Sequence, residues 1–368
     1  FSISQNRCSF DEYRESLKDR GLYRDAPAAG KIVHFQNSYT IPVVVHVLYN
    51  NDEENISDER IYSQIETLNN DYNANNLELD NLPTEFLDVL GNVGISFCLV
   101  QTDLNGNQFS GINRVYTDVE SFQGFDDAMK NTNQGGIDAW DTSKYLNIWV
   151  CNLLGNTLGF ATMPGSVDAE LDGVVIDYQH FGVDSSFENP YNLGRTATHE
   201  VGHYLNLEHT FYAGCSDWDG CDDTPAISSP TYGCPDYPQM SCQLNSMTMN
   251  YMDYADDACM YMFTICQAEI MVSALLNLRS DLLLSLSSYD CTVSIQENAS
   301  SINYIFPNPV NDWLVIPMDN VFISILDIYG KEVYSKYIQS EELLNISSLK
   351  KGCYIVRCGN KNYNFIKI

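Results

Sequence analysis

The chain has 368 residues, of which 49 are acidic and 19 are basic, so its formal net charge is −30. This charge argues against nucleic acid as a partner, and the lack of any run of about eighteen apolar residues argues against a membrane span. The 12 cysteines indicate an oxidising compartment outside the cytoplasm.

Residues 1–38 precede the first long apolar run and form a segment of their own. Residues 10–22 have the charged, amphipathic pattern of a helix, and residues 26–30 have the Pro, Ala and Gly content of a linker. Cys8 lies just ahead of this helix and directly follows Arg7. We therefore expect an appended segment that carries one cysteine.

The next part of the chain predicts strands alternating with a helix. Residues 39–50 form a nearly continuous apolar run, as expected of a buried strand. His46 lies inside this run, and nothing near it has metal-ligand spacing, so we interpret it as a core histidine. Ser57 is a good N-cap for the helix that follows, and residues 94–99 and 145–151 are further buried strands. This order predicts a twisted mixed sheet with helices behind it.

Residues 199–209 carry the strongest chemical signal. They read H-E-x-x-H-x-x-N-x-x-H and hold half of the six histidines. On a helix, His199 and His203 share a face, so that two imidazoles can meet one metal ion. Glu200 would lie close enough to touch a water on that metal. The alternative is a chance pattern of core histidines, which the ligand spacing argues against.

The same motif predicts where this helix ends. A third ligand at helical spacing would point away from the metal, so the chain must turn. Asn206 can make the turn, because asparagine tolerates the left-handed conformation at a helix C-terminus. His209 then returns as the third ligand. Three neutral imidazoles on zinc leave one position open for water, which is the catalytic arrangement.

The part of the chain around and after the motif is strongly acidic. Residues 196–278 contain eleven carboxylates and no Lys or Arg. The turn-rich loop of residues 215–226 includes Asp219, Asp222 and Thr224. Calcium, which takes hard oxygen ligands, would offset the repulsion. The alternative is an acidic face exposed to water.

The composition changes towards the C-terminus. We predict a final helix over residues 266–286 and a polar linker over residues 291–302. Residues 303–368 hold 7 basic and 6 acidic side chains, against 12 and 43 in the residues before them. Their short alternating strands predict a small β-sandwich.

The histidine motif resembles that of the metzincin zinc peptidases, whose pattern has glycine where this chain has Asn206. Residues 250–254, Asn-Tyr-Met-Asp-Tyr, resemble the methionine turn that metzincins place beneath the zinc. Within the metzincins, residues 198–211, 223–226 and 252–260 are most similar to the pappalysin family, in particular to its small ulilysin-like members.

This resemblance implies a fold class and a domain organisation. The fold is α+β: a metzincin catalytic domain over residues 39–290, with a twisted mixed sheet, backing and active-site helices and a loop-rich lower subdomain. Residues 1–38 would be its N-terminal pro-segment. The linker of residues 291–302 and a small all-β sandwich domain over residues 303–368 would follow.

The resemblance also implies roles for single residues. They are the zinc ligands His199, His203 and His209, the general base Glu200, the oxyanion donor Tyr254 and the platform residue Met252 under the zinc. The calcium ligands would be Asp219 and Thr224, with Asp222 beside them. The disulfide pairs would be Cys215–Cys242 and Cys234–Cys259, although spacing alone allows three connectivities.

Three further residues are implied to bind substrate. Gly159 and Phe160 lie in the strand that forms the sheet edge above the cleft, where an extended peptide can add as a strand. Asp257 would line the pocket for the side chain just after the scissile bond, where it favours Arg or Lys. Asp256 is the alternative if the register is shifted by one residue.

Cys8 is a candidate latency switch. In latent zinc peptidases a pro-segment cysteine can occupy the open metal position as a thiolate. Related proteins use Arg-x-Cys-Gly patterns, whereas here Arg7 directly precedes the cysteine and Ser9 replaces the glycine. The alternatives are an ordinary disulfide partner and a blocking carboxylate such as Asp11.

The last part of the chain resembles another family. Residues 306–310, 328–333 and 349–356 are similar to the C-terminal sorting domain of the type IX secretion system of Bacteroidetes-like bacteria. The resemblance implies secretion machinery as a partner and a protein that is secreted or attached to the cell surface. The alternative is an accessory module that binds carbohydrate or protein.

Together these patterns predict a secreted zinc endopeptidase, with calcium as a second metal and with peptide or protein substrates that have basic residues, Arg or Lys being preferred just after the scissile bond. The alternative is a catalytically idle, zinc-stabilised adhesin or binding module at the cell surface. The intact Glu200 argues against it, because a purely structural zinc site needs no base.

Overall fold

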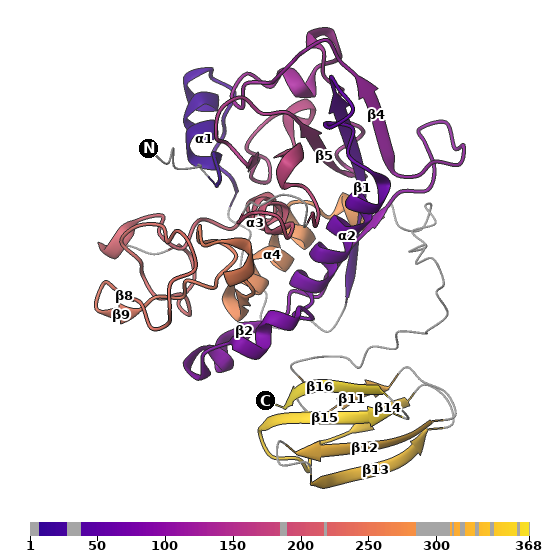
Figure 1. Ribbon diagram of the computed structural model, residues 1–368, viewed down its shortest axis with the longest axis vertical. Coiled ribbons are helices and arrows are strands. Elements are labelled where there is room, and N and C mark those ends of the chain that lie inside the picture. Colours follow the sequence, from indigo (N-terminus) through magenta and orange to yellow (C-terminus); the bar gives the residue numbers. More distant parts are fainter. Residues whose placement is uncertain are drawn as a thin grey trace. The chain divides into compact units, whose positions relative to one another are not determined.

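The structure is a computed structural model that describes residues 7–27, 38–184, 190–216, 219–284, 310, 313–316, 321–327, 331–338, 342–358 and 361–367. The chain divides into two compact units, residues 1–293 and 294–368, which we describe separately (Figure 1). The predicted linker of residues 291–302 lies outside the described residues.

A six-stranded mixed sheet forms the frame of the first unit, as predicted. Its strand order is β3-β1-β5-β7-β6, and β4 also pairs with β1. All pairs are parallel except β6 with β7, which makes β6 an antiparallel edge strand. The strands are β1 (Tyr39–Tyr49), β3 (Ile95–Leu99), β4 (Ile112–Tyr116), β5 (Leu146–Cys151), β6 (Gly159–Ala161) and β7 (Val174–Asp177).

Both faces of the sheet are buried. Side chains alternate between the two faces along each strand, and each face has its own apolar cluster. On β5, Ile148 joins one apolar cluster and Trp149 another. On β6, Ala161 belongs to the first cluster and Phe160 to the second. The first cluster also contains residues of α2 (Asp58–Tyr72), α3 (Arg195–Tyr204) and α4 (Ile265–Asn277), and the second contains residues of α1 (Phe10–Asp19).

Helix α2 begins where the sequence predicts it. The Ser57 side chain accepts a hydrogen bond from the Arg60 backbone N–H at 3.3 Å, which satisfies one of the free donors of the first turn. Figure 1 shows α2 running alongside β1. The predicted final helix is shorter than expected: α4 ends at Asn277, and a separate turn, α5 (Asp281–Leu284), follows it.

His46 is a core histidine, as predicted from the strand around it. Its side chain is fully buried in β1, and Nε2 lies 2.9 Å from the Asn147 side-chain oxygen. Burial lowers the pKa of His46 to about 4. The residue therefore stays neutral and structural.

The part of the first unit around α4 is rich in loops. Two short antiparallel pairs occur there, β2 (Leu90–Gly91) with β10 (Phe263–Thr264), and β8 (Met240–Ser241) with β9 (Leu244–Asn245). Disulfides join Cys215 to Cys242 and Cys234 to Cys259, as the family resemblance implied. They cross-link loops that have little regular structure of their own.

The second unit is a small all-β structure, as predicted. Strands β11 (Trp313–Ile316) and β14 (Glu342–Asn345) form one sheet. Strands β13 (Glu332–Ile338), β12 (Val321–Asp327), β15 (Gly352–Cys358) and β16 (Lys361–Lys367) form the other, in this order. Residues of both sheets, including Leu314, Ile325 and Val356, share one apolar core.

Strand β14 was not predicted from the sequence. Residues 306–309 and 328–330 of the predicted sorting motifs lie outside the described residues. None of the helices in the described part of the chain has the length and apolar character needed to cross a bilayer.

Candidate active site

Helix α3 carries three of the predicted site residues and is buried along its whole length. A buried polar group holds it against α2. The Thr198 hydroxyl donates to Asp71 at 2.7 Å, and Arg195 pairs with the same carboxylate at 3.2 Å. Burial raises the pKa of Asp71 to about 6, although Arg195 and Thr198 act in the opposite direction. These contacts connect the active-site helix to the frame of the first unit.

The chain turns back after α3 at the position the sequence predicts. Asn206 has a positive φ of 78°, and the Leu207 N–H donates to the Gly202 carbonyl at 3.0 Å. Gly202 is needed for packing, because an added Cβ would lie 2.5 Å from the Met252 sulfur. Met252 therefore lies directly against the helix that carries the histidines.

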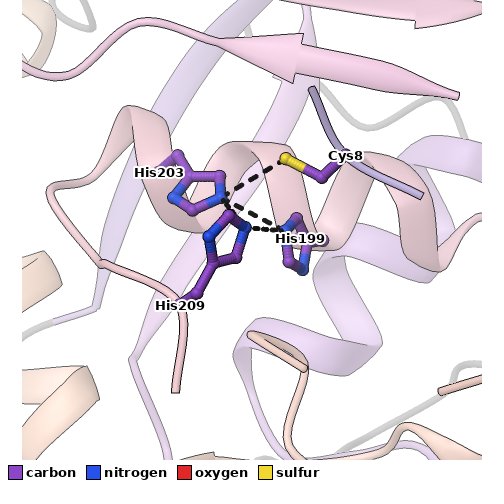
Figure 2. A group of neighbouring side chains, drawn as sticks. All are labelled: Cys8, His199, His203 and His209. Carbon is purple, nitrogen blue, oxygen red and sulfur yellow. Dashed lines mark hydrogen bonds between the residues drawn. The ribbon is translucent and has the colours of Figure 1, made fainter. Parts of the chain in front are cut away.

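The turn brings the three predicted histidines together (Figure 2). The Nε2 atoms of His199, His203 and His209 lie 3.0–3.2 Å from one another. Zinc–nitrogen bonds of about 2.0–2.1 Å in a tetrahedral site place two nitrogens roughly 3.3 Å apart. The three side chains thus fit one zinc ion.

The outer nitrogen of each ring has its own acceptor, which fixes the ring orientation. Nδ1 of His199 lies 2.6 Å from the Tyr251 carbonyl, and Nδ1 of His203 lies 2.7 Å from the Leu207 carbonyl. A proton on Nδ1 leaves a lone pair on Nε2 for a metal. Burial lowers the pKa of both rings well below the usual value, which favours this neutral form.

Cys8 supplies a fourth potential ligand from the N-terminal segment. Its sulfur lies 3.6 Å from His203 Nε2 and belongs to the same group of converging ligand atoms (Figure 2). The Phe10 ring stacks on the His203 ring with centroids 4.0 Å apart. The alternative blocking residue, Asp11, instead lies 3.1 Å from the outer Nδ1 of His209. The thiol, not the carboxylate, therefore faces the metal position.

Glu200 lies beside this cluster in a fully buried position. Neither of its carboxylate oxygens has a hydrogen-bond partner at standard geometry among the described residues. Burial raises the pKa of Glu200 to about 8, and the nearby Cys8 thiol and Arg7 lower it in part. Gly159 permits this close packing, because an added Cβ would lie 3.1 Å from Glu200 Cγ and 2.9 Å from the Val175 carbonyl.

Tyr254 reaches the cluster from the other side. Its hydroxyl donates to the Cys8 carbonyl at 3.1 Å and lies 3.2 Å from His209 Nε2. A peptide carbonyl thus already occupies the position beside the metal ligands, with a phenol as its hydrogen-bond donor. This position suits an oxyanion donor.

Asp257 lines a pocket that already holds a basic side chain. Arg7 and Asp257 form an ion pair of 2.7 Å in which both side chains are 0% exposed. The Arg7 guanidinium also donates to the Ala255 carbonyl at 2.7 Å and lies 4.9 Å from the centre of the Tyr191 ring. Asp256 is only partly buried, so the register places Asp257 in the pocket.

Two residues of this pocket, Arg7 and Tyr191, were not predicted from the sequence to be site residues. The one signal for Arg7 was its position next to Cys8. No local pattern indicated Tyr191, which lies more than 180 residues along the chain from Arg7.

The predicted calcium residues are only partly brought together. The Thr224 hydroxyl lies 2.7 and 2.9 Å from the two carboxylate oxygens of Asp219. Burial raises the pKa of Asp219 to about 6. Asp222, in contrast, is exposed.

Comparison with known protein families gives two matches. Residues 130–276 match the family model described as Pregnancy-associated plasma protein-A. Residues 304–368 match the secretion system C-terminal sorting domain. The first match contains the histidine cluster, Glu200, Tyr254 and Asp257.

Individual proteins are similar over most of the first unit. An extracellular metalloprotease of Pyricularia oryzae is 32% identical, with 74% of this chain and 90% of that protein covered. Mature mirolysin of Tannerella forsythia, solved with a cleaved peptide, is 44% identical with a TM-score of 0.67, covering 69% of this chain and 98% of that chain. A promirolysin mutant from the same organism is 41% identical with a TM-score of 0.67, covering 76% and 92%.

The turn at Asn206 gives a prediction. Asn206→Gly will keep the unfolding free energy within about 0.5 kcal/mol, because glycine adopts this conformation freely. Asn206→Val will cost about 1–2 kcal/mol and will lower the zinc content, because a β-branched side chain strains the turn that delivers His209. Thermal unfolding and metal analysis of both variants provide the check. Equal zinc content and stability in the two variants would contradict it.

Proposed function

The chain belongs to the pappalysin family and is a secreted zinc metalloendopeptidase, and on this premise we propose that Glu200 is its general base and that Asp257 selects a basic residue after the scissile bond. The observation that carries the specificity proposal is the buried pair between Arg7 and Asp257. The observation that supports the base is the unpaired, buried Glu200 carboxylate beside the histidine cluster.

His199, His203 and His209 would hold the zinc through Nε2. Zinc, when bound, supplies a Lewis acid that polarises the peptide carbonyl and acidifies a water molecule. The acceptors at the outer nitrogens orient the rings for this role.

Glu200 would move the proton in the reaction. A buried carboxylate with no fixed hydrogen-bond partner can accept a proton from the attacking water. The same carboxyl group can then deliver that proton to the leaving amine. The edge strand beside it, with Gly159 at the point of closest approach, would align the substrate backbone.

Tyr254 would donate to the developing oxyanion. Its hydroxyl already donates to the Cys8 carbonyl beside the metal ligands. A substrate carbonyl in that position would receive the same hydrogen bond, which strengthens as negative charge develops.

Asp257 would set the specificity. The Asp257 carboxylate is buried, and its second oxygen accepts from the Leu193 and Arg195 backbone N–H groups at 2.9 and 3.1 Å. These bonds hold the other oxygen toward the pocket, where Arg7 binds it. A substrate arginine or lysine in the same position would make the same charge-assisted contact.

Cleavage of a peptide library by activated protein tests these two roles. Wild-type protein will cut before Arg and Lys. Glu200→Gln will lower the rate by about 10²–10⁴-fold, because proton transfer is lost. Asp257→Asn will keep activity but reduce the preference for basic residues by about 10–100-fold, because a charge-assisted hydrogen bond becomes a neutral one.

Asp236→Asn is a matched control, since Asp236 is an exposed carboxylate of the same acidic stretch. It will leave rate and preference unchanged. Zinc-dependent cuts without a basic preference would overturn the role of Asp257 and leave the peptidase intact.

We also propose that residues 7–20 keep the enzyme latent. Cys8 would occupy the open zinc position and Arg7 the specificity pocket. Because Arg7 precedes Cys8, the segment passes the histidines in the direction opposite to that of a substrate, whose basic residue follows the scissile bond. A further ion pair of 2.8 Å joins Arg14 to Glu208.

Latency can be tested in the full chain. Cys8→Ala and Arg7→Ala will each raise the initial activity by at least about tenfold, because each removes roughly 1.4 kcal/mol or more of binding from the segment. The control is Lys18→Ala, since Lys18 is 43% exposed, forms an ion pair with Glu15 of its own helix and lies over the Tyr23 ring of the same N-terminal segment. Unchanged latency in both variants would show that other contacts block the cleft.

A calcium site at Asp219 and Thr224 remains our proposal, supported by the convergence of their oxygens. Calcium at about 100 times its dissociation constant will raise the unfolding midpoint of zinc-saturated protein by about 5 °C. Asp219→Asn will abolish this rise, and Asp236→Asn will not. A rise that is equal in both variants would place the ion elsewhere.

The second unit supports secretion. The match of residues 304–368 to a sorting domain agrees with a protein that is secreted or attached to the cell surface. We propose that this domain, residues 303–368, engages the secretion machinery, and that residues 39–290 are the catalytic domain. The idle adhesin is not retained, because the chain belongs to a peptidase family and keeps Glu200.

A further inference from the structure

The pro-segment fills one more pocket, away from the histidines. Tyr13 of α1 is 1% exposed. Its hydroxyl donates to the Asp127 carboxylate at 2.5 Å and accepts from the Lys130 ammonium at 3.0 Å. Its ring lies 4.5 Å from the Phe160 ring, measured between centroids. The phenol is therefore recognised at both its polar and its apolar ends.

This pocket belongs to the catalytic domain and is built from buried charges. Asp127 and Lys130 are 4% and 3% exposed and pair with each other at 3.2 Å. Lys130 also donates to the Leu171 carbonyl at 2.8 Å. Asp127 has a positive φ of 58°, a backbone strain that clusters at binding sites.

The pocket adjoins the cleft on the side before the scissile bond. Arg7 marks the pocket after that bond and Cys8 marks the zinc, so the residues from Ser9 onward lie on the opposite side. The Ser9 N–H donates to the Gly159 carbonyl at 3.0 Å, and Phe160 is the next residue of the edge strand.

An extended substrate can span the distance between the positions of Ser9 and Tyr13. The Tyr13 N–H donates to the Ser9 carbonyl at 2.8 Å, so the two residues are one helical turn apart, about 6 Å along the axis. An extended peptide covers that distance in about two residues. If Ser9 corresponds to the residue before the scissile bond, Tyr13 corresponds to the third residue before it.

We propose that Asp127, Lys130 and Phe160 form a subsite that takes a tyrosine side chain at the third substrate residue before the scissile bond. The inference rests on the proposed function of the cleft. Once the pro-segment leaves, Asp127 loses Tyr13 and also Arg20, which pairs with its other oxygen at 2.8 Å. A substrate phenol restores a donor for the carboxylate and an acceptor for the ammonium, and phenylalanine restores neither.

The test compares peptides that differ in one atom. The full chain is activated by limited proteolysis, and kcat/KM is measured for peptides with Tyr or Phe at the third residue before the cut. Each pair is made with Arg and with Ala after the cut. Wild-type protein will prefer Tyr over Phe by at least about tenfold, as expected when phenylalanine makes neither of the two hydrogen bonds of the phenol to these charged groups.

Two variants test whether the preference for Tyr over Phe comes from this pocket. Lys130→Met keeps the apolar stem and removes the ammonium, and Asp127→Asn keeps a residue that tolerates the left-handed conformation. Both will bring the Tyr-to-Phe ratio close to 1 and leave the Arg-to-Ala ratio unchanged. Lys144→Met is the control, because Lys144 is 48% exposed and pairs with Asp141. It will keep both ratios.

A Tyr-to-Phe ratio near 1 in wild-type protein would overturn the subsite, even if a variant fails to fold. A high ratio that persists in both variants would also overturn it. A loss of the Arg preference with an intact Tyr preference would overturn the role of Asp257 and leave the subsite standing.

Discussion

The active site depends on three imidazole nitrogens being held about 3 Å apart inside the protein. Burial favours the neutral form of His199 and His203, and the backbone acceptors at their outer nitrogens orient the two rings. The arrangement forms because the chain reverses at Asn206. The reversal in turn needs Gly202 and Met252 in close contact beneath the histidines. The buried contacts of Asp71 with Arg195 and Thr198 keep the helix itself in place.

The N-terminal segment lies in this site, and we propose that its contacts reproduce those of a substrate. Arg7 pairs with the Asp257 carboxylate, the Cys8 carbonyl accepts from Tyr254, and the Ser9 N–H donates to the edge strand. The contacts of this segment therefore indicate which substrate groups the cleft can bind. Arg7 and Tyr254 are both buried where they make these contacts, so losing a partner there is costly. Tyr13 makes a further contact of this kind, with Asp127 and Lys130.

The sequence predicted what is encoded by local spacing. The ligand pattern, the left-handed residue at Asn206, the buried strand around His46 and the mixed sheet all follow from short-range rules. Contacts between residues that are far apart in the sequence could not be predicted from these rules. Arg7 and Asp257 are 250 residues apart, and Tyr13 and Lys130 are 117 apart, so no local pattern indicates that they meet.

We propose that three histidines and Cys8 share one zinc ion in the full chain. X-ray absorption spectroscopy of the zinc-loaded, full-length protein tests it directly, because sulfur and nitrogen ligands differ in bond length. The spectrum of the full chain will show one sulfur at about 2.3 Å and three nitrogens at about 2.0–2.1 Å, and oxygen will replace the sulfur once the N-terminal segment is removed. A spectrum of the full chain with only nitrogen and oxygen ligands would contradict it.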